Sequence, residues 1–266
     1  KSGKEATTLL KNIYKKWIPE EKILTLNIWS AELSKLASNA MLAQRISSIN
    51  SLSFLCEKTG ANINEVSKAI GMDHRIGNKF LNPSPGFGGS CFQKDILNLV
   101  YLFKYYGLDD IAEYWHQVVK MNNYQRLRIA NKIKDFISEK KLEKKVIILG
   151  WAFKKDTNDS RESSSIYVSF ELLKMGYEIY VYDPKVNNTR ILNDLKQLKQ
   201  DLNNSEVNID KNIKVLNTLK SAFKHEYPIV ILTEWDEFKE INYLNTKLKI
   251  FDFRNIINRE KTIFSL

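Results

Sequence analysis

The sequence has little cysteine and no long run of apolar residues. Only two cysteines, Cys56 and Cys91, occur in 266 residues, and two cysteines do not make the framework of a disulfide-stapled secreted domain. We therefore expect a reducing, cytoplasmic location. No stretch approaches the roughly 18 consecutive apolar residues of a membrane-spanning helix. The first four residues, KSGK, do not have the charged-then-apolar order of a signal peptide, so no membrane partner is expected.

A nucleic-acid-binding module is also absent, although the formal net charge is +10. Binding to nucleic acid calls for basic side chains gathered on one face, with aromatic platforms or a known motif. Much of the basicity lies instead in stretches of mixed sign, such as residues 131–145, which are typical of solvated helix faces. We expect no nucleic-acid partner and no metal, while the excess of positive charge suits an anionic small molecule.

The first half of the sequence predicts helices. Residues 30–58 contain no Pro or Gly and have apolar residues at helical spacing, which predicts a long helix that Gly60 ends. Asn62 and Glu65 resemble a capping box, so a short helix is expected to reach about Ile70. Two further helices are predicted at about residues 92–103 and 111–137.

After residue 140 the apolar period changes to that of strands. Strands are predicted at residues 145–150, 177–183, 227–233 and 248–252, with a helix at 162–175 between the first two. Residues 187–212 are interpreted as a polar connection. The predicted fold class is α/β, with an all-helical domain followed by a Rossmann-like domain whose sheet is mainly parallel.

The most informative segment is NPSPGFGGS at residues 82–90, whose prolines and glycines predict a shaped loop. The helix that follows offers unpaired N–H groups and a positive dipole end, which would stabilise a thiolate at Cys91. Cys91 is therefore the best candidate nucleophile. Asp95 lies four residues on, where a carboxylate can handle a proton or orient a water. The spacing leaves open that Cys91 is a small buried side chain and Asp95 a surface carboxylate.

On the long helix, Lys35 and Asn39 also stand four residues apart. A lysine can stabilise a developing oxyanion, and an asparagine can hydrogen-bond it or position water. The alternative is a solvated lysine beside a surface amide.

The junction at residues 149–165 joins a strand to a helix, and ligands of open α/β sheets bind at that edge. Its cations Lys154, Lys155 and Arg161 suit a diphosphate. Because the junction lacks GxGxxG and the phosphate-loop pattern, it is not marked as a primary dinucleotide site. Arg254 follows another strand near the same edge, although a charged loop residue is often only solvated.

Four separated motifs resemble the UDP-glucose dehydrogenase family, in its eukaryotic-type form. Residues 29–50 resemble the family's central helix, residues 71–77 and 86–95 its substrate loop and nucleophile, and residues 153–165 its C-terminal signature. The resemblance implies that UDP-glucose is oxidised to UDP-glucuronate by two NAD-dependent hydride transfers. Cys91 would form a thiohemiacetal and then a thioester, which water would release.

The resemblance also implies a role for each matching residue. Lys35 would stabilise the oxyanion, Asn39 would bind the sugar or water, and Asp95 would assist proton transfer. Arg75 matches a residue that reaches the sugar in the neighbouring subunit's site. The other implied substrate-binding residues are Asn82, Gly86, Phe87, Gly88, Phe92, Phe153, Lys154 and Arg254. Arg161 and the backbone from Cys91 to Lys94 would touch NAD.

Three regions follow from the resemblance. Residues 1–28 resemble only the last helix and strand of an N-terminal NAD-binding Rossmann domain, residues 29–140 a central helical domain that forms a homodimer, and residues 141–266 a UDP-binding α/β domain. Because the NAD site would lie largely on the absent domain, we expect the chain alone to bind NAD weakly and to be inactive. Alanines and serines along the long helix favour at least a dimer.

The sequence departs from the family pattern at two places in the expected substrate pocket. Asn82 stands where many relatives have lysine, and Phe253–Arg254–Asn255 replaces a common Gly–Arg–Arg. Two alternatives stay open. The chain could belong to a dehydrogenase of another nucleotide sugar, or it could be a non-catalytic UDP-sugar-binding or oligomerisation module.

Overall fold

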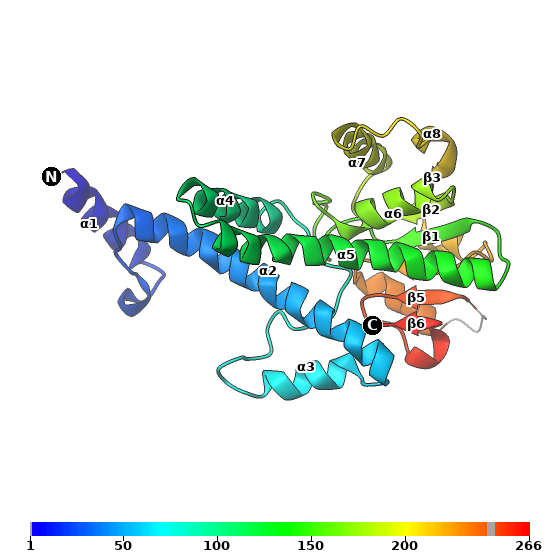
Figure 1. The fold of residues 1–266 in the computed structure, drawn as a ribbon, viewed down its shortest axis with the longest axis horizontal. Coiled ribbons are helices and arrows are strands. Elements are labelled where there is room, and N and C mark those ends of the chain that lie inside the picture. The colour runs from blue at the N-terminus through cyan, green and yellow to red at the C-terminus, as the bar shows by residue number, and fades with distance from the viewer. Residues whose placement is uncertain (1, 244–247) are drawn as a thin grey trace.

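The computed structural model describes residues 2–243 and 248–266. A helical region precedes an α/β domain with a parallel sheet, which confirms the predicted fold class (Figure 1). The helical region contains α1 (Ser2–Tyr14), η1 (Glu20–Lys22), α2 (Ile28–Thr59), α3 (Ile63–Gly71), α4 (Phe92–Tyr105) and α5 (Asp109–Glu139). No helix in the described part of the chain is long and apolar enough to cross a membrane.

The ends of α2 and α3 follow from their capping residues. The Asn27 side chain accepts a hydrogen bond from the Ser30 N–H at the start of α2, and Gly60 ends that helix with a φ of 78°. Asn62 caps α3 by accepting from the Asn64 N–H, and its amide also contacts Glu65. The predicted long helix and the short helix after it are therefore both present.

The sheet has six parallel strands in the order β3-β2-β1-β4-β5-β6. The strands are β1 (Lys145–Leu149), β2 (Glu178–Tyr182), β3 (Ile213–Val215), β4 (Ile229–Ile231), β5 (Ile250–Asp252) and β6 (Phe264–Ser265). The sequence predicted β1, β2, β4 and β5. It missed β3 and β6, because two or three residues are too few to show an alternating pattern.

The predicted polar connection at residues 187–212 is largely helical. It contains α7 (Asn188–Asp201) and α8 (Ile209–Asn212), and Asn187 caps α7 by accepting from the Arg190 N–H. The side chains of Ile191, Leu195 and Leu198 are buried and recur at helical spacing. These three apolar residues outweigh the polar composition of the segment, since one buried stripe is sufficient to dock a helix.

Helices cover both faces of the sheet. In a parallel sheet, residues in register point to the same face, and the register aligns Tyr182 with Asp252 through β1 and β4. Phe251 therefore points to the opposite face from Tyr182. Phe136 of α5 contacts Phe251, and Phe238 of η2 (Asp236–Tyr243) contacts Tyr182. Helix α6 (Ser164–Lys174) packs against α5. The short helix α9 (Leu219–Ala222) packs against β2.

Helix α5 belongs to two hydrophobic cores. Its first half packs with α2 and α4, where Ala112 and Val119 are buried. Its second half joins the core of the sheet domain through residues such as Ile133 and Ile137. In Figure 1 this helix runs continuously from the helical region to the sheet. Side chains near its middle can therefore contact both parts of the molecule.

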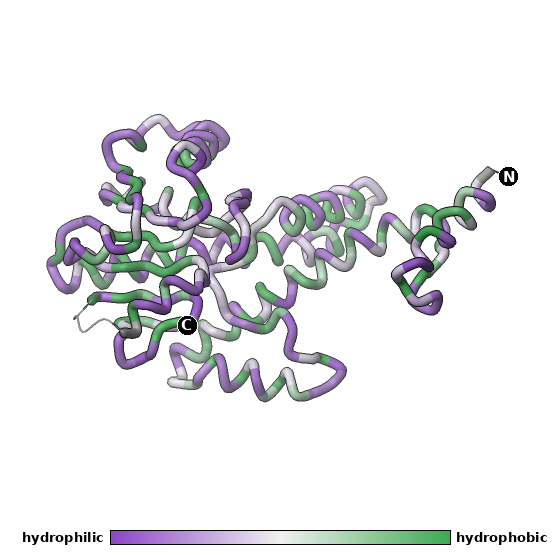
Figure 2. Tube along the Cα trace, turned by 180° about the vertical axis from the view of Figure 1, so that it is seen from behind, coloured by the Kyte–Doolittle hydropathy of each residue, from purple (hydrophilic) through white to green (hydrophobic). Residues whose placement is uncertain are grey.

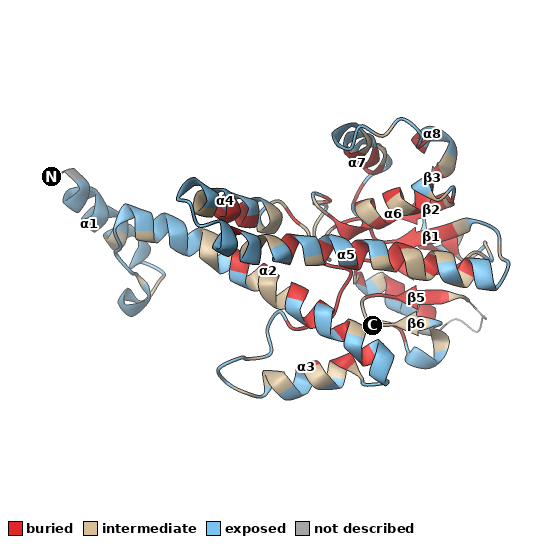
Figure 3. Cartoon of the chain, viewed as in Figure 1, coloured by how far each residue is buried: buried red, intermediate tan, exposed pale blue. Residues whose placement is uncertain are grey.

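Residues 3–33 project from the rest of the described chain (Figures 1 and 3). Apolar residues recur along this segment (Figure 2). The side chains of several are exposed, including Leu9 at 65%, Leu24 at 77% and Trp29 at 71%. The predicted helix is present as α1, but residues 23–27 form no strand. A strand needs a neighbouring strand for its hydrogen bonds, and none lies beside this segment among the described residues.

Candidate active site

Three of the four predicted catalytic side chains meet where α2 passes the start of α4. The Lys35 ammonium forms an ion pair with the Asp95 carboxylate, and the Asn39 side-chain amide donates a hydrogen bond to the same oxygen, Oδ2. Asp95 is only 2% exposed, whereas the Lys35 side chain is 58% exposed. Asp95 is therefore not a surface carboxylate, and its charge is met by a cation whose end remains accessible.

The surroundings of Asp95 keep it ionised. Burial acts to raise the pKa of Asp95, but hydrogen bonds from Lys35 and Asn39 and the charges of Lys35 and Lys94 outweigh burial. The net effect lowers the pKa below its ordinary value of 3.8. At neutral pH this group is a carboxylate, which accepts a proton rather than donating one.

Cys91 immediately precedes α4 and is exposed. It is therefore not a small buried side chain. Its backbone carbonyl accepts the hydrogen bond of the Asp95 N–H at 2.9 Å, so Cys91 lies one helical turn before the carboxylate. The Ser90 hydroxyl lies 3.6 Å from the Cys91 sulfur. Phe92 contacts the rings of both Phe80 and Phe87. The candidate nucleophile is therefore an exposed side chain at the N-terminus of α4, and the next residue, Phe92, packs in a cluster of aromatic rings.

The loop before Cys91 is held by polar side chains of α2 and α5. Asn122 accepts from the Phe87 N–H at 2.9 Å and donates to the Phe87 carbonyl at 3.0 Å. Gln125 donates to the Ser84 carbonyl, and Asn50 accepts from the Ser84 N–H. A loop cannot satisfy these backbone groups itself, so neighbouring helices supply their partners.

The sequence prediction missed Asn50, Asn122, Gln125 and Arg126. A signal for the last three exists in the spacing of α5, since they fall on the same helical stripe as the buried Val118, Val119, Ile129 and Ile133. Polar residues on an otherwise apolar stripe are expected to be buried and to need partners. Such a pattern in α5 predicts that a non-helical segment packs against it.

Two of the predicted loop glycines are required by close packing. A Cβ at Gly86, where φ is +121°, would lie 2.5 Å from Asn122 Oδ1. A Cβ at Gly88 would lie 2.6 Å from the Glu162 carbonyl oxygen and 2.9 Å from the Phe153 Cβ. The loop therefore approaches both α5 and the β1–α6 junction more closely than any other residue type allows.

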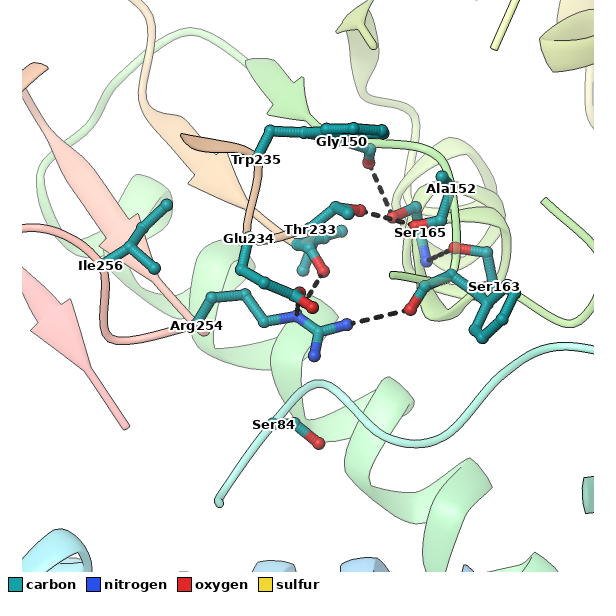
Figure 4. A network of polar contacts seen from close by, with 12 residues as sticks. Ser84, Gly150, Ala152, Ser163, Ser165, Thr233, Glu234, Trp235, Arg254 and Ile256 are labelled. Atoms are coloured by element: carbon teal, nitrogen blue, oxygen red, sulfur yellow. Dashed lines mark hydrogen bonds and ion pairs between the residues drawn. The ribbon is translucent and has the colours of Figure 1, made fainter. Parts of the chain in front are cut away.

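In the sheet domain, Arg254 turns inward from the end of β5. Its guanidinium donates to the carbonyls of Leu232 at 2.8 Å and Phe153 at 3.3 Å and lies 3.2 Å from Glu234. Figure 4 shows this side chain between Glu234 and the loop after β1. Burial lowers the pKa of Arg254, and the charges of Glu234 and Asp252 oppose that effect. The side chain is 15% exposed, so Arg254 is not merely solvated.

The β1–α6 junction carries the other predicted residues of this domain. The Lys154 ammonium lies 5.6 Å from the centre of the Phe153 ring, and Lys154 is exposed. Figure 4 also shows why the junction keeps its shape, since Ser165 donates to the Gly150 carbonyl and Thr233 to the Ala152 carbonyl. Lys154 is therefore presented to solvent from a fixed backbone.

An exposed arginine and a helix start offer groups that can bind an anion. Arg161 is exposed, and its guanidinium pairs with Asp159 at 2.7 Å. The hydrogen bond that Arg161 donates to Asp159 is the largest of the effects that raise the pKa of Arg161, and Cys91 adds to them electrostatically. The helix start after Cys91, which includes the exposed Lys94, offers backbone donors for an anion.

The sheet itself does not offer the usual ribose site. In dinucleotide-binding folds an acidic residue after β2 binds a ribose hydroxyl, and Asp183 has that place here. Asp183 instead accepts from the backbone N–H groups of Trp151 and Ala152 and from the Trp235 indole. Its other oxygen accepts from the N–H groups of Lys185 and Val186. This carboxylate is fully used in holding the loops together.

Two predicted substrate-binding residues lie outside the cluster. Arg75 is exposed, with its side chain at 79%, and its guanidinium pairs with Asp73. Asn82 is exposed and lines a cavity of about 600 Å³ with Asn64, Ser67, Lys68, Asn78, Lys79 and Phe80. Among the described residues, neither side chain has a hydrogen bond or ion pair with Cys91, although Phe80, which lines the same cavity as Asn82, contacts Phe92.

Some small residues of α2 are used within the chain. Ala40, Ala43 and Ser47 are buried against α4 and α5, and the Ser47 hydroxyl donates to the Val118 carbonyl. Other small residues of the helix, such as Ser34 and Ser38, are exposed, so the predicted dimer contact stays a prediction. Other positions on α2 are exposed apolar residues, namely Leu33 (51%), Met41 (52%), Leu52 (41%) and Leu55 (62%).

Comparison with known proteins gives two matches to one family. Residues 29–124 match the central domain of the UDP-glucose/GDP-mannose dehydrogenase family, and residues 147–259 match its UDP binding domain. The chain therefore belongs to the UDP-glucose/GDP-mannose dehydrogenase family and contains these two domains.

Within this family, the similar curated proteins are UDP-glucose 6-dehydrogenases. The chain is 51% identical to the one from Mus musculus over an alignment of 266 positions that covers 96% of this chain and 52% of the mouse protein. It is 49% identical to UDP-glucose 6-dehydrogenase 3 from Arabidopsis thaliana over 97% of this chain and 56% of that protein. The chain spans about half the length of the curated relatives it matches.

A solved structure of a related enzyme has the same fold over almost the whole of this chain. The UDP-glucose dehydrogenase of Pyrobaculum islandicum superimposes with a TM-score of 0.79 at 26% identity and covers 98% of this chain and 56% of the archaeal chain. The two-part architecture is thus shared by a distant relative.

Proposed function

We propose that this chain supplies the nucleophile and the UDP-sugar-binding domain of a UDP-glucose 6-dehydrogenase, which oxidises UDP-glucose to UDP-glucuronate. The observation that carries the proposal is the cluster at the start of α4, where Lys35 and Asn39 meet the ionised Asp95 one turn after an exposed Cys91. The similarity to UDP-glucose 6-dehydrogenases supports the same substrate.

In the proposed reaction, Cys91 holds the substrate covalently. The Cys91 sulfur bonds to C6 at the aldehyde stage to give a thiohemiacetal, whose oxidation leaves a thioester. Water then attacks the thioester carbon, and breaking of the carbon–sulfur bond returns the thiol and gives a carboxylate. The exposed ammonium of Lys35 is available to stabilise the oxyanion in both steps. Asp95 is ionised at neutral pH because its pKa is lowered, so its carboxylate is available to accept a proton, and Asn39 orients the sugar or the water.

A nicotinamide cofactor, proposed to be NAD, would accept the two hydrides when it is bound. On this chain, Arg161 and the backbone donors from Cys91 to Lys94 fit its anionic or polar edge. Arg254 and Lys154, at the end of β5 and after β1, suit the UDP diphosphate, with Phe153 beside them, and Phe92 at the start of α4 is proposed to line the sugar side. The residue types are appropriate to these partners, and their assignment is part of the proposal.

The stoichiometry of oxidation tests the covalent scheme. In a polypeptide that carries this chain and has the full length of the relatives, we expect two molecules of NADH per UDP-glucose, measured by absorbance against product. Cys91→Ser should stall after the first oxidation or accumulate an intermediate, while Cys56→Ser, in a buried position away from α4, serves as the matched control. A ratio of one with release of an aldehyde, or full turnover by Cys91→Ser, would exclude the scheme.

Calorimetry on the chain itself separates the alternatives. We expect it to bind UDP-glucose and to bind NAD weakly or not at all. Tighter binding of another nucleotide sugar than of UDP-glucose would favour a dehydrogenase of that sugar. Binding of neither UDP-glucose nor NAD would favour an oligomerisation module.

We also propose a homodimer that forms through the exposed apolar residues of α2, such as Leu33 and Met41, since exposed apolar patches mark interaction sites. Light scattering of wild-type chain and of Leu33→Glu tests this interface, and a monomeric wild type would exclude it. Both cysteines are unpaired, which agrees with the proposed cytoplasmic location.

A further inference from the structure

Arg126 connects two segments that are far apart in the sequence. It lies in the middle of α5 and is 2% exposed. One guanidinium nitrogen donates to the Phe87 carbonyl at 3.0 Å and to the Glu162 carbonyl at 2.8 Å, and Nε contacts the Ser164 hydroxyl at 3.3 Å. A single side chain thus bridges the loop before Cys91 and the loop that carries Arg161.

The buried charge of Arg126 is met mainly by neutral groups. Its guanidinium carbon lies 3.9 Å from the centre of the Tyr167 ring, and the Tyr167 hydroxyl donates to the Glu162 carboxylate at 2.6 Å. Burial lowers the pKa of Arg126, while Tyr167 and Glu162 oppose the shift. Burying such a charge is costly, and an apolar residue would fill the space without that cost. The carbonyl bridge is therefore the feature that needs an arginine, whose planar fork has five donors.

The same two loops also contact each other directly. The Gly89 N–H donates to the Arg161 carbonyl at 2.8 Å, and Gly88 packs against the Phe153 side chain. Cys91 comes two residues after Gly89, and Arg161, whose guanidinium is a cation of the second loop, is the residue that Gly89 contacts. Fixing the two loops together therefore fixes the position of the nucleophile relative to this cation.

We propose that Arg126 is a positioning residue that locks the Cys91 loop to the Arg161 loop, so that the nucleophile and the cofactor side of the site keep one geometry. The inference rests on the proposed function only for what the two loops bind. It predicts that loss of the bridge changes the chemistry at Cys91 before it changes the fold as a whole.

The two cysteines allow a test on this chain. Iodoacetamide labelling followed by mass spectrometry measures the alkylation rates of Cys91, which is exposed, and Cys56, which is buried and reports general loosening. The variants are Arg126→Met and Arg126→Lys, with Arg128→Met as the matched control. Arg128 is on the same helix, but it pairs with Glu57 and stacks on Phe54.

We expect Arg126→Met to slow alkylation of Cys91 by about fivefold, because the Cys91 loop loses its fixed place on the Arg161 loop. Cys56 should keep its rate. Arg126→Lys should behave in the same way, since a lysine keeps the charge but loses the planar fork. Arg128→Met should leave Cys91 unchanged even if it lowers the melting temperature. Tyr167→Phe is a milder variant, because it removes the hydroxyl but keeps the ring against the Arg126 guanidinium. It should slow the alkylation of Cys91 by about twofold.

Three results would overturn the positioning role. They are a folded Arg126→Met with an unchanged Cys91 rate, equal effects of Arg126→Met and Arg128→Met on Cys91, and a parallel rise of the Cys91 and Cys56 rates. The affinity for UDP-glucose, measured on the same variants, should fall with the Cys91 rate. If the wild-type chain does not bind UDP-glucose, the proposed function fails while the alkylation test of Arg126 still stands.

Discussion

Two neighbouring segments of the helical region differ sharply in how they are held. The nucleophile loop, residues 82–91, is mostly buried, and its backbone is bonded by side chains of α2 and α5. The Arg75 segment, residues 72–80, is anchored near its end by Arg45, which donates to the carbonyls of Gly77 and Lys79. The rest of that segment is exposed, and Arg75 itself pairs with Asp73 only two residues away.

The two segments therefore differ in whether contacts within this chain fix their conformation. The nucleophile loop has its shape fixed by contacts inside the chain, as a preorganised catalytic loop requires. The tip of the Arg75 segment has no such contacts among the described residues. This agrees with the proposal that Arg75 acts in a neighbouring subunit, where its final surroundings would be provided by the partner.

The largest effect is expected from adding one methyl group to the nucleophile loop. Gly88→Ala would place a Cβ 2.6 Å from the Glu162 carbonyl oxygen, and backbone cannot move aside as a side-chain end can. We expect a loss of about 3 kcal/mol in the free energy of unfolding and loss of measurable UDP-glucose binding. Urea unfolding and calorimetry measure the two effects.

Gly77→Ala in the Arg75 segment is the matched control for that experiment. Gly77 has a φ of +67° but open space around its Cβ position, so only backbone strain of about 1 kcal/mol is expected. Equal losses for the two variants would mean that the nucleophile loop is not more tightly packed than the Arg75 segment, and the comparison would fail.

A smaller loss of stability is expected when Asn122, which binds the backbone of the nucleophile loop, is replaced. Asn122→Ala leaves both the N–H and the carbonyl of Phe87 without their hydrogen bonds, in a buried place. We expect the free energy of unfolding to fall by about 2 kcal/mol. Asn131→Ala, on the same helix at a partly exposed position, should cost less than about 0.5 kcal/mol. Unfolding curves that coincide for the two variants would contradict the anchoring role of Asn122.

The fold was largely predictable because its main elements carry long local patterns. The 32 residues of α2 contain no Pro or Gly and are bounded by Asn27 and Gly60, and β1 and β2 are short apolar runs around a helix. Elements whose stability comes from neighbours were missed. β6 has two residues and exists because β5 supplies its hydrogen bonds, which no local pattern records.

For the candidate site, the sequence identified residue types but not all of their relations. The spacing of Cys91 and Asp95 predicted their place on one helix, yet only the fold shows that Lys35, 60 residues earlier, meets Asp95. Arg126 and Asn122 were missed because their partners are backbone carbonyls and N–H groups, which have no sequence signature. The polar interruption of the apolar stripe of α5 was the one available signal.

The ion pair at the start of α4 should give a moderate, pH-dependent effect. The pKa of Asp95 is lowered in the folded state, so its charge stabilises the fold above the unfolded value of 3.8 and loses this contribution as the pH falls through the folded value. Asp95→Asn should therefore cost about 1 kcal/mol at neutral pH, and the difference from wild type should shrink below about pH 4. Asp110→Asn, at an exposed position, is the control. A difference that grows towards acid would reverse the assigned sign.

The smallest effect is expected at the tip of the Arg75 segment. Arg75→Ala removes an exposed pair with Asp73, and exposed pairs contribute little because water screens them. The free energy of unfolding should change by less than about 0.5 kcal/mol, while Arg126→Met costs several times more. Urea unfolding of both variants decides the point. A loss above about 1 kcal/mol for Arg75→Ala would show that the Arg75 segment is already packed within this chain, and the contrast with the nucleophile loop would disappear.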